Sequence, residues 1–507
     1  MEGRTLATHY ERLSTLDASF LSFEDRAAHM HMGSTSLFDA TPFRQEGGGL
    51  NFELIERCIL GHLPRHPRLR QKLWWPVGGP PVWIDDPKFE TSFHVRRVAL
   101  PSPGTESELK ALAGNILSMQ LDTSRPLWEV WIIEGVADDR FALLWKIHHA
   151  LADGVSARDI LIGYLGFERS TEAPEIPRFV PRPAPSLGRL HLDEALRRFE
   201  QSRDASARLQ GFLKGAVKGM DGRGLSDAAA ALLQVGAGLL SDVVPTPFNG
   251  DIGPHRRFDW TSCDLGVLQE IRKQSGAKIN DVVLTAVCGA VRSYLLDKKV
   301  PVDELPFRVM VPVSMRGQGE TANGGNRVSN LTIPLPLFET DPRRRLQTIV
   351  DTTTRVKASG QSSMGDALMQ ALDWAGIQAP LPLARFAAEH MPANLVVTNI
   401  PGPQRRQFLL ESELLESFPM VPLAKGQGLG IALYSYNGVM HWGLNGDLDL
   451  VPDLDRLVKA IDVETARLQR AHSAIEVRPP APPPAVSSEE SADPATTGSR
   501  RKVKQAK

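Results

Sequence analysis

The pattern of apolar and polar residues in the first 150 positions predicts both helices and strands. Segments 51–64 and 105–119 carry apolar residues three and four positions apart, which predicts two amphipathic helices. Segments 128–136 and 141–147 are short and rich in Trp, Ile, Val and Leu, which predicts two buried strands. Helices and strands mixed in one region indicate the α/β class.

The second half of the chain repeats this mixture. Residues 279–296 are apolar on nearly all sides of a helix, which predicts a buried helix. The apolar runs 429–436 and 440–448 flank Asn437-Gly438, a dipeptide typical of two-residue β-hairpin turns. Further elements are expected as strands at 307–313, 328–337 and 395–399 and as a closing helix at 453–468.

Breaks in these patterns divide the chain. The Pro-rich stretch 174–185 interrupts regular structure. After it, the pattern is mostly helical, with a basic amphipathic part near 209–218 that is a candidate membrane contact, although an ordinary surface helix is the favoured interpretation. The Pro- and Ser-rich end cannot bury a core, so disorder is expected there. We therefore expect an N-terminal domain at 1–185, a helical crossover linker at 186–254, a second domain at 255–472 and a tail at 473–507.

Composition and charge exclude several classes of function. The formal net charge is -1, so bulk electrostatics give no reason to expect a nucleic-acid partner. Three widely spaced cysteines form neither a disulfide framework nor a zinc pattern, which suits the cytoplasm. A spanning helix requires about 20 apolar residues, and the best apolar stretch, 228–240, is shorter and contains Gln234, so no transmembrane segment is expected. The N-terminus lacks an apolar signal-peptide core, so no signal peptide is expected either.

The segment FALLWKIHHALADGVSARDIL, residues 141–161, carries the candidate chemistry. Its apolar strand ends at His148 and His149, and adjacent strand residues point to opposite faces. The two rings therefore cannot easily chelate one metal, and one is expected to face a cavity while the other packs elsewhere. Gly154 permits a sharp turn beside Asp153. A histidine at a strand end is rigidly placed, as a general base must be; a structural histidine pair is the alternative.

The pattern His-His-x-x-x-Asp-Gly resembles the active-site motif of the acyl-CoA-dependent acyltransferase superfamily. That superfamily includes chloramphenicol acetyltransferase, plant alcohol acyltransferases and peptide-synthetase condensation domains. Other segments resemble the bacterial wax ester synthase/diacylglycerol acyltransferase family, over about residues 12–470. They are LSTLDASFLSFED at 13–25, MHMGS at 30–34, RPLW at 125–128, Asn280-Asp281, PVSMR at 312–316 and NIPGP at 399–403. Thr15 departs from the family, where proline is expected, far in sequence from the chemistry.

The resemblance implies that His149 is the general base. It would take the proton of an acceptor hydroxyl, whose oxygen attacks the acyl-CoA thioester directly without an acyl-enzyme. The chain has no G-x-S-x-G nucleophile elbow. Asp153 is expected to fix the loop by pairing with an arginine, with Arg316 as candidate partner, and orienting the ring is the alternative. For Arg316 the alternative is a solvated arginine at a strand end. His148 is expected to shape the pocket or bind backbone.

Further residues are implied along a substrate channel. For the Pro-Leu-Trp segment the alternative is core packing, and for the Asn-Asp pair helix capping is favoured over direct catalysis. For the Thr-Asn segment before Pro401 the alternative is a Pro-Gly turn. His29 and His31 alternate on a possible strand, and structural roles are favoured over a metal site. The candidate channel residues are Pro126, Leu127, Trp128, Asn280, Asp281, Arg316, Thr398 and Asn399.

The fold implied by the resemblance is α/β with mixed sheets, as two chloramphenicol-acetyltransferase-like domains with the active-site channel at their interface. The expected reaction transfers a long-chain acyl group from acyl-CoA to diacylglycerol, giving triacylglycerol, or to a fatty alcohol, giving a wax ester. No cofactor or metal is implied, because the thioester is already activated. Attachment to a membrane or lipid-droplet surface is expected to be peripheral, through apolar and basic surface near residues 205–245, with added attraction of the basic C-terminal end to anionic lipid.

Two other functions stay open at this point. One is a stand-alone condensation-type acyltransferase that uses carrier-protein thioesters. The chain has no Leu-Gly-Gly-x-Ser carrier motif and no adjoining synthetase domain, which weakens this alternative. The other is a catalytically silent lipid-binding homologue, against which the intact His149, Asp153 and Gly154 argue.

Overall fold

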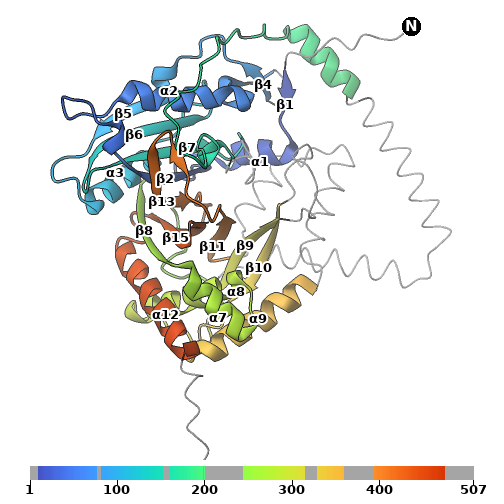
Figure 1. Cartoon of the computed structure of the whole chain (residues 1–507). Helices are drawn as coiled ribbons and strands as arrows, with labels where there is room; N and C mark the ends of the chain where they lie inside the picture. The colour runs from blue at the N-terminus through green and yellow to red at the C-terminus, as the bar shows by residue number, and fades with distance from the viewer. Residues whose placement is uncertain are drawn as a thin grey trace, which may run out of the picture.

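The computed structural model describes residues 10–76, 81–151, 159–197, 199, 244–314, 328–358 and 393–473. Their strands form two mixed sheets of six strands each and a small sheet of three strands. Figure 1 shows the two large sheets in separate halves, the N-terminal half above and the C-terminal half below. The mixed α/β class predicted from the sequence is thereby confirmed.

The large sheet of the N-terminal half has the strand order β12-β13-β2-β7-β6-β5. In it, β2 and β7 pair antiparallel from His31 opposite His148 to Asp39 opposite Arg140, so the histidine-bearing ends of both strands lie together. Its strands are β2 (His31–Asp39), β5 (Val95–Ala99), β6 (Trp128–Val136), β7 (Arg140–His148), β12 (Phe408–Leu409) and β13 (Ser412–Met420). The small sheet contains β1 (Glu11–Arg12), β3 (Gln71–Trp74) and β4 (Val82–Asp85).

Polar caps set the starts of the helices in this half, which are α1 (Thr15–Phe23), α2 (Phe52–His62) and α3 (Glu106–Ser118). Ser14, Asn51 and Thr105 each accept a backbone N–H of the first helical turn. Such caps stabilise a helix by about 1 kcal/mol each. The helices predicted at 51–64 and 105–119 are therefore confirmed as α2 and α3. Short 3₁₀ helices connect the elements at η1 (Thr41–Phe43), η2 (Leu63–Arg65), η3 (Pro67–Arg70) and η4 (Thr91–Phe93).

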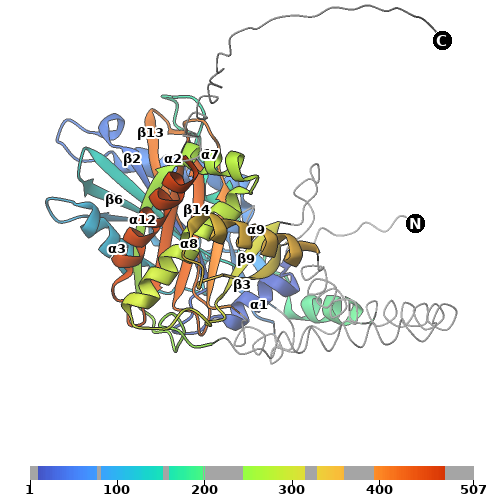
Figure 2. The ribbon, with the colours of Figure 1, turned by 90° about the horizontal axis from the view of Figure 1, so that it is seen from below.

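The sheet of the C-terminal half has the order β10-β9-β11-β14-β15-β8, and helices pack on one of its faces (Figure 2). Asn437 and Gly438 have φ angles of 46° and 82°, so the predicted two-residue hairpin is confirmed. The strands are β8 (Arg256–Asp264), β9 (Arg308–Ser314), β10 (Val328–Pro334), β11 (Leu395–Pro401), β14 (Leu429–Tyr436) and β15 (Val439–Asp447). The helices are α7 (Leu265–Ser275), α8 (Ile279–Asp297), α9 (Pro342–Ala358) and α12 (Leu454–Ser473).

Helix α8 is the buried helix predicted at 279–296. Among the described helices it alone has the length and apolar composition to cross a bilayer, but 72% of its apolar window is buried inside the protein. It packs against α7, α9 and α12 and contributes to the main core of the C-terminal half. Its apolar character therefore serves the protein core.

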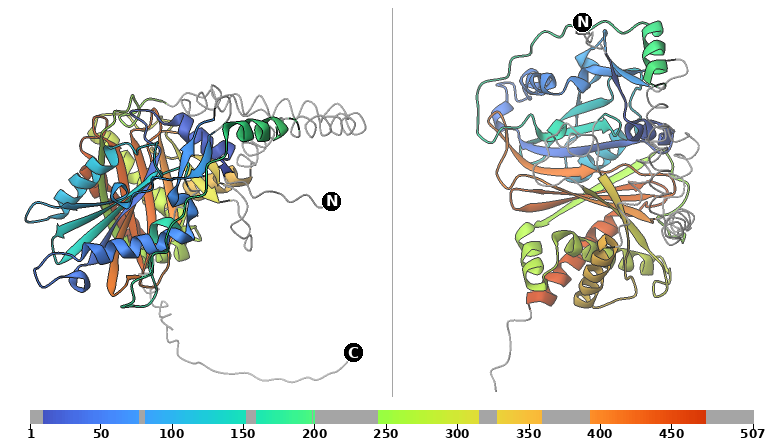
Figure 3. Two further views of the ribbon diagram at one scale, coloured as in Figure 1. Left: turned by 90° about the horizontal axis from the view of Figure 1, so that it is seen from above. Right: turned by 90° about the vertical axis from the view of Figure 1, so that its right-hand side faces the viewer.

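One strand of the C-terminal sequence lies in the N-terminal sheet. β13 pairs antiparallel with β2, where Phe418 lies opposite Thr35, and Ser36 and Ser417 join their hydroxyls at 2.9 Å. β13 also packs on β14 and β15, so it bridges the two sheets, which lie face to face in Figure 3. The domain boundaries predicted from the sequence assign β13 to the second domain. They did not predict that β13 pairs with a strand of the N-terminal sheet.

Part of the predicted crossover linker is described. Residues 187–197 are helical and dock on the small sheet through Leu190, which is 2% exposed. Tyr10 donates to Asp193 at 2.9 Å, and Arg12 pairs with Glu194 at 2.6 Å. The Pro-rich stretch before this helix has neither helix nor strand, as predicted. The linker residues 201–243, including the candidate membrane segment, and the tail from 474 onward lie outside the described residues.

Candidate active site

The predicted motif begins where β7 ends. His148 is fully buried, and its backbone N–H donates to the carbonyl of Leu127 at 3.0 Å. Its ring Nδ1 accepts the N–H of Ala150 at 3.0 Å. A neutral ring that accepts at Nδ1 carries its proton on Nε2, and this nitrogen lies 3.3 Å from Glu24 Oε2. The ring of His148 thus fixes the turn that follows the strand.

His149 has different neighbours, as strand alternation predicts. Its backbone N–H donates to the carbonyl of Met30 at 2.8 Å, and the residue is only half-buried. Its ring stacks on Phe20 of α1, with centroids 3.9 Å apart and planes inclined by 24°. Phe20 also packs in an apolar cluster with Leu423 and Ile252 of the C-terminal half. His149 therefore lies close to the place where the two halves meet.

A buried carboxylate that the sequence analysis did not single out lies between two histidines. Glu24, the residue that ends α1, has Oε1 3.4 Å from His31 Nε2 and Oε2 3.3 Å from His148 Nε2. Burial raises the pKa of Glu24, but the N–H groups of His148 and His31 outweigh it and lower the pKa to about 2. Burial lowers the pKa of His31 to about 3. At neutral pH the site therefore holds an ionised carboxylate beside a neutral His31.

The other histidine of that segment takes a structural place. His29 precedes β2, is buried, and its Nε2 donates to the carbonyl of Arg26 at 2.9 Å. Within the described ranges, no group of three or more His, Cys, Asp and Glu side chains is placed to hold a metal ion.

A buried lysine supports the same face of β7. Lys146 donates from Nζ to the carbonyls of Met119 at 2.8 Å and Ile116 at 3.2 Å, and lies 3.4 Å from Glu129 Oε2. Burial lowers its pKa, while Glu129 opposes the shift. Lys146 thereby ties the C-terminal end of α3 to the strand that carries His148.

The Pro-Leu-Trp segment packs beneath the histidine turn. Trp128 is fully buried, donates from its indole N–H to the carbonyl of Leu69 at 2.7 Å, and stacks on His94 at 4.6 Å. Leu127 is also fully buried, and Pro126 is buried beside it. These are the contacts of core packing, the alternative considered from the sequence; a channel-lining role for this segment stays a prediction.

Two of the predicted segments in the C-terminal half meet. Asn399 Nδ2, at the end of β11, donates to Asn280 Oδ1, at the start of α8, at 2.8 Å. Both residues and Thr398 are half-buried. Asp281 accepts the N–H of Lys278 at 2.9 Å as a helix cap, and it accepts the hydroxyl of Thr353 of α9 at 2.9 Å as a helix–helix hydrogen bond.

Three predicted site residues cannot be placed. Asp153, Gly154 and Arg316 lie outside the described residues. The ion pair expected between Asp153 and Arg316 therefore stays a prediction.

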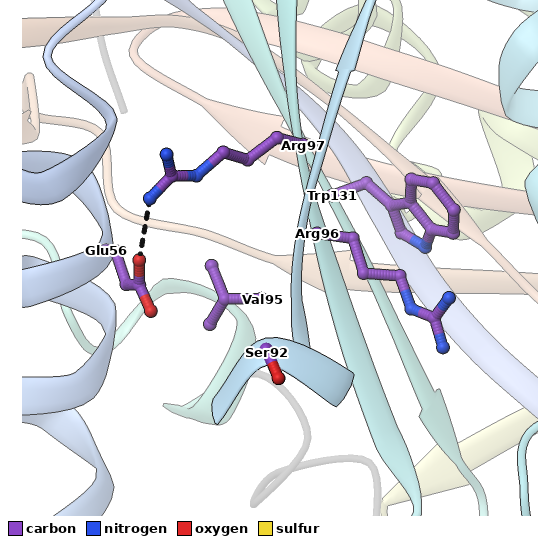
Figure 4. Close-up of a pocket in the computed structure, with 6 residues that line it drawn as sticks. All are labelled: Glu56, Ser92, Val95, Arg96, Arg97 and Trp131. Atoms are coloured by element: carbon purple, nitrogen blue, oxygen red, sulfur yellow. Dashed lines mark hydrogen bonds and ion pairs between the residues drawn. The ribbon is translucent and has the colours of Figure 1, made fainter. Parts of the chain in front are cut away.

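A surface hollow of about 390 Å³ lies at the edge strand β5, away from these residues (Figure 4). Arg97 pairs there with Glu56 at 3.0 Å, and Arg96 lies 5.2 Å from the ring centroid of Trp131. β6 separates this edge from β7. Because Arg97 is already paired and the hollow is separate from the histidine turn, we do not assign the chemistry to it.

Comparison with known proteins identifies the family. Residues 13–283 match the wax ester synthase/diacylglycerol acyltransferase catalytic domain, and residues 324–469 match the C-terminal domain of the same family. The chain belongs to the wax ester synthase/diacylglycerol acyltransferase family. The resemblance seen in the sequence motifs is confirmed, and with it the enzyme class of diacylglycerol O-acyltransferases and wax ester synthases.

Individual relatives agree with this assignment. The chain is 31% identical over 469 residues to the probable diacylglycerol O-acyltransferase tgs1 of Mycobacterium tuberculosis, covering 90% of this chain and 95% of the relative. It is 32% identical over 475 residues to tgs2 of the same organism, covering 90% and 98%.

Solved structures share the fold. The wax ester synthase/diacylglycerol acyltransferase from Marinobacter aquaeolei VT8 superposes with a TM-score of 0.64 at 24% identity, over 91% of this chain and 100% of that one. The first condensation domain of the CDA synthetase superposes with a TM-score of 0.53 at 15% identity, over 92% and 97%. The two-domain fold shared with condensation domains is as the sequence motif implied.

Proposed function

We propose that the protein transfers a long-chain acyl group from acyl-CoA to diacylglycerol, a fatty alcohol or both, with His149 as general base. The observation that carries the proposal is the placement of His149. It follows a strand end, its backbone is bound to Met30, and its ring stacks on a helix residue that also contacts the C-terminal half. A base held in this way can meet two substrates that enter a channel between the halves from opposite sides.

The proposed reaction is a single displacement. His149 takes the proton of the acceptor hydroxyl, and the oxygen forms a bond to the thioester carbonyl carbon. The carbon–sulfur bond then breaks, and the thiolate of CoA receives the proton from His149. General-base catalysis of this kind contributes about 10²–10⁴-fold. Positioning of the two substrates and stabilisation of the oxyanion supply the rest.

The cysteines support a route without an acyl-enzyme. Burial raises the pKa of Cys58 and Cys288 to about 12 each and that of Cys263 to about 11. The thiolate is the nucleophilic form of cysteine, so none of the three is a competent nucleophile at neutral pH. The activated thioester of acyl-CoA also makes a cofactor unnecessary.

The substrate classes follow from the relatives. Two mycobacterial relatives are named diacylglycerol O-acyltransferases, and the solved Marinobacter relative is named for wax ester and diacylglycerol chemistry. We therefore assign long-chain acyl-CoA as donor and diacylglycerol or a fatty alcohol as acceptor. The condensation-type alternative is supported by fold similarity alone.

The enzyme is proposed to work in the cytoplasm, attached peripherally to a membrane or lipid-droplet surface. The helix at 187–197 and the residue Phe199 present an apolar stripe outward: Leu192 is 55%, Leu196 53% and Phe199 68% exposed. Positions i, i+4 and i+7 share one helix face, and this face lies opposite the one that docks through Leu190. An amphipathic helix with such a stripe fits the boundary of a lipid surface, where water-insoluble products must leave.

The test of the function uses the purified full chain. It is incubated with radiolabelled palmitoyl-CoA and either diacylglycerol or hexadecanol, and the lipid products are separated by thin-layer chromatography. Labelled triacylglycerol or wax ester supports the proposal. Label transferred only from a palmitoyl carrier protein supports the condensation-type alternative. Lipid binding without transfer from either donor indicates a silent homologue.

A further inference from the structure

The last turn of α1 contacts both histidines of the motif. Phe20 stacks on His149 at 3.9 Å, and the Glu24 carboxylate lies 3.3 Å from His148. Phe20 lies in α1 and Glu24 is the C-cap four positions later, whose N–H donates to the carbonyl of Phe20 at 3.1 Å. Residues with this spacing lie on one face of a helix. The C-terminal end of α1 therefore contacts the rings of both adjacent histidines.

The Glu24 contact constrains the proton on His148. The Nδ1 atom of His148 is occupied by the N–H of Ala150, so the ring proton is on Nε2 and faces the carboxylate. If the proton moved to Nδ1, two N–H groups would face each other and the turn would open. An ionised Glu24 therefore favours the tautomer that closes the turn before His149.

Among the described residues, the cations in this part of the fold pair with carboxylates other than Glu24. Lys146 is engaged with Glu129, and Arg256 with Asp447. The adjacent carboxylate of Asp25 pairs with Lys425. The groups that face Glu24 from β2 and β7 are His31 and His148. Charge is costly to bury without a compensating cation, so this carboxylate is a local source of negative potential beside the motif.

We propose that Glu24 is the positioning residue of the His148–His149 pair: it holds the turn closed through His148 and favours the protonated form that His149 takes during transfer. Together with Phe20 it sets the ring of His149 in place. The proposal rests on the function proposed above, in which His149 is the base. Glu24 itself acts through His148 and does not touch the substrates.

The test replaces Glu24 by glutamine, which keeps the shape and removes the charge. The glutamine amide then presents an N–H donor to one of the two histidines. His31 can accept at Nε2 in the variant, because the N–H of Leu121 is placed to donate to this atom. The matched control is Glu464→Gln. The Glu464 side chain is 10% exposed, as is that of Glu24, and it pairs with the buried Arg345 at 2.7 Å in the other half.

Two measurements separate positioning from mere stability. The first is the pH profile of kcat/KM with palmitoyl-CoA. The second is the pKa of His149 from ring hydrogen–deuterium exchange followed by mass spectrometry, which requires no turnover. As a general scale, Coulomb's law gives a pKa shift of about half a unit for one charge at about 10 Å and an effective dielectric constant of about 40.

We expect Glu24→Gln to lower the pKa of His149 by this amount and to move the acidic limb of the kcat/KM pH profile to lower pH by the same amount. We also expect kcat to fall about 10- to 100-fold while KM stays nearly unchanged. Glu464→Gln should lower Tm but leave the pKa and the profile in place. An unchanged His149 pKa and kcat in Glu24→Gln, or equal effects in both variants, overturns the proposal. If the pKa shifts as expected while the wild-type protein transfers no acyl group, Glu24 positioning stands and the proposed function fails.

Discussion

Replacing each histidine of the motif by alanine should separate catalysis from stability. His149→Ala removes a half-buried ring whose stacking on Phe20 contributes about 0.5–1.5 kcal/mol. We therefore expect the free energy of unfolding to fall by about 1 kcal/mol. The lost base should slow acyl transfer by about 10²–10⁴-fold, which corresponds to about 3–5 kcal/mol in the activation barrier.

His148→Ala should show the opposite balance. His148 is fully buried, accepts the N–H of Ala150 and lies 3.3 Å from the carboxylate of Glu24. Its removal leaves a cavity and an uncompensated buried charge, which together cost about 3–5 kcal/mol. The activity of the folded fraction should fall less than in His149→Ala, because the base remains.

The assay compares both variants with the wild type in two experiments. Urea unfolding followed by circular dichroism gives the loss of stability, and initial rates with labelled palmitoyl-CoA give the loss of activity. If His149→Ala retains activity within about tenfold of wild type, the base assignment is wrong, given the usual size of general-base effects. If His148→Ala keeps wild-type stability but loses turnover, His148 would be the base and His149 the structural residue, the reverse of the proposed assignment.

Four further predictions follow from other parts of the structure. The pKa of Glu24 is lowered to about 2 and that of His31 to about 3, so their contribution to stability is complete above about pH 6.5 and is lost as the pH falls toward 2; urea midpoints at pH 7 and pH 4 should show the decrease. Phe418→Ala, in the strand that bridges the sheets, should cost about 3–5 kcal/mol, and two separate unfolding transitions are expected to replace one. Asp281→Ala should lower Tm, by about 1–3 kcal/mol of unfolding free energy, but leave kcat of the folded protein within about twofold, since its contacts are a cap and a helix–helix hydrogen bond; a large kcat loss at unchanged Tm would indicate direct catalysis. Leu196→Glu should reduce flotation with anionic liposomes while turnover of a detergent-dispersed acceptor is kept, and undiminished flotation would place the lipid contact elsewhere.

The sequence alone determined the elements whose signals are local. Helices α2 and α3 begin at side-chain caps, and the β14–β15 hairpin turns at Asn437-Gly438, whose positive φ angles the dipeptide favours. The buried helix α8 was evident because it is apolar on all sides. The family, and with it the enzyme class, followed from motifs of a few residues that chemistry holds at fixed spacing.

The sequence also indicated which predicted residues belong together, but only in part. Asn280 and Asn399 were singled out in separate segments, and the fold joins them by a hydrogen bond. Trp128 was expected near the channel, with core packing as the alternative, and the structure gives it core contacts. Whether a buried aromatic side chain faces a channel or the core depends on which residues pack against it. The spacing of apolar residues along the sequence does not give this information.

Only the tertiary structure showed that β13 joins the N-terminal sheet and that the carboxylate of Glu24 lies between His31 and His148. β13 contains Pro419, and apolar and polar residues do not alternate regularly along it. Its partner β2 is more than three hundred residues away in sequence. Glu24 and Phe20 both lie in the segment 13–25 at helical spacing, which was the signal available, but nothing local distinguishes Glu24 from a solvated carboxylate. Its role arises because β2 and β7 bring His31 and His148 to the end of α1. Strand pairing and the burial of charge are non-local properties of the folded chain, so their consequences appear only when the sheets are assembled.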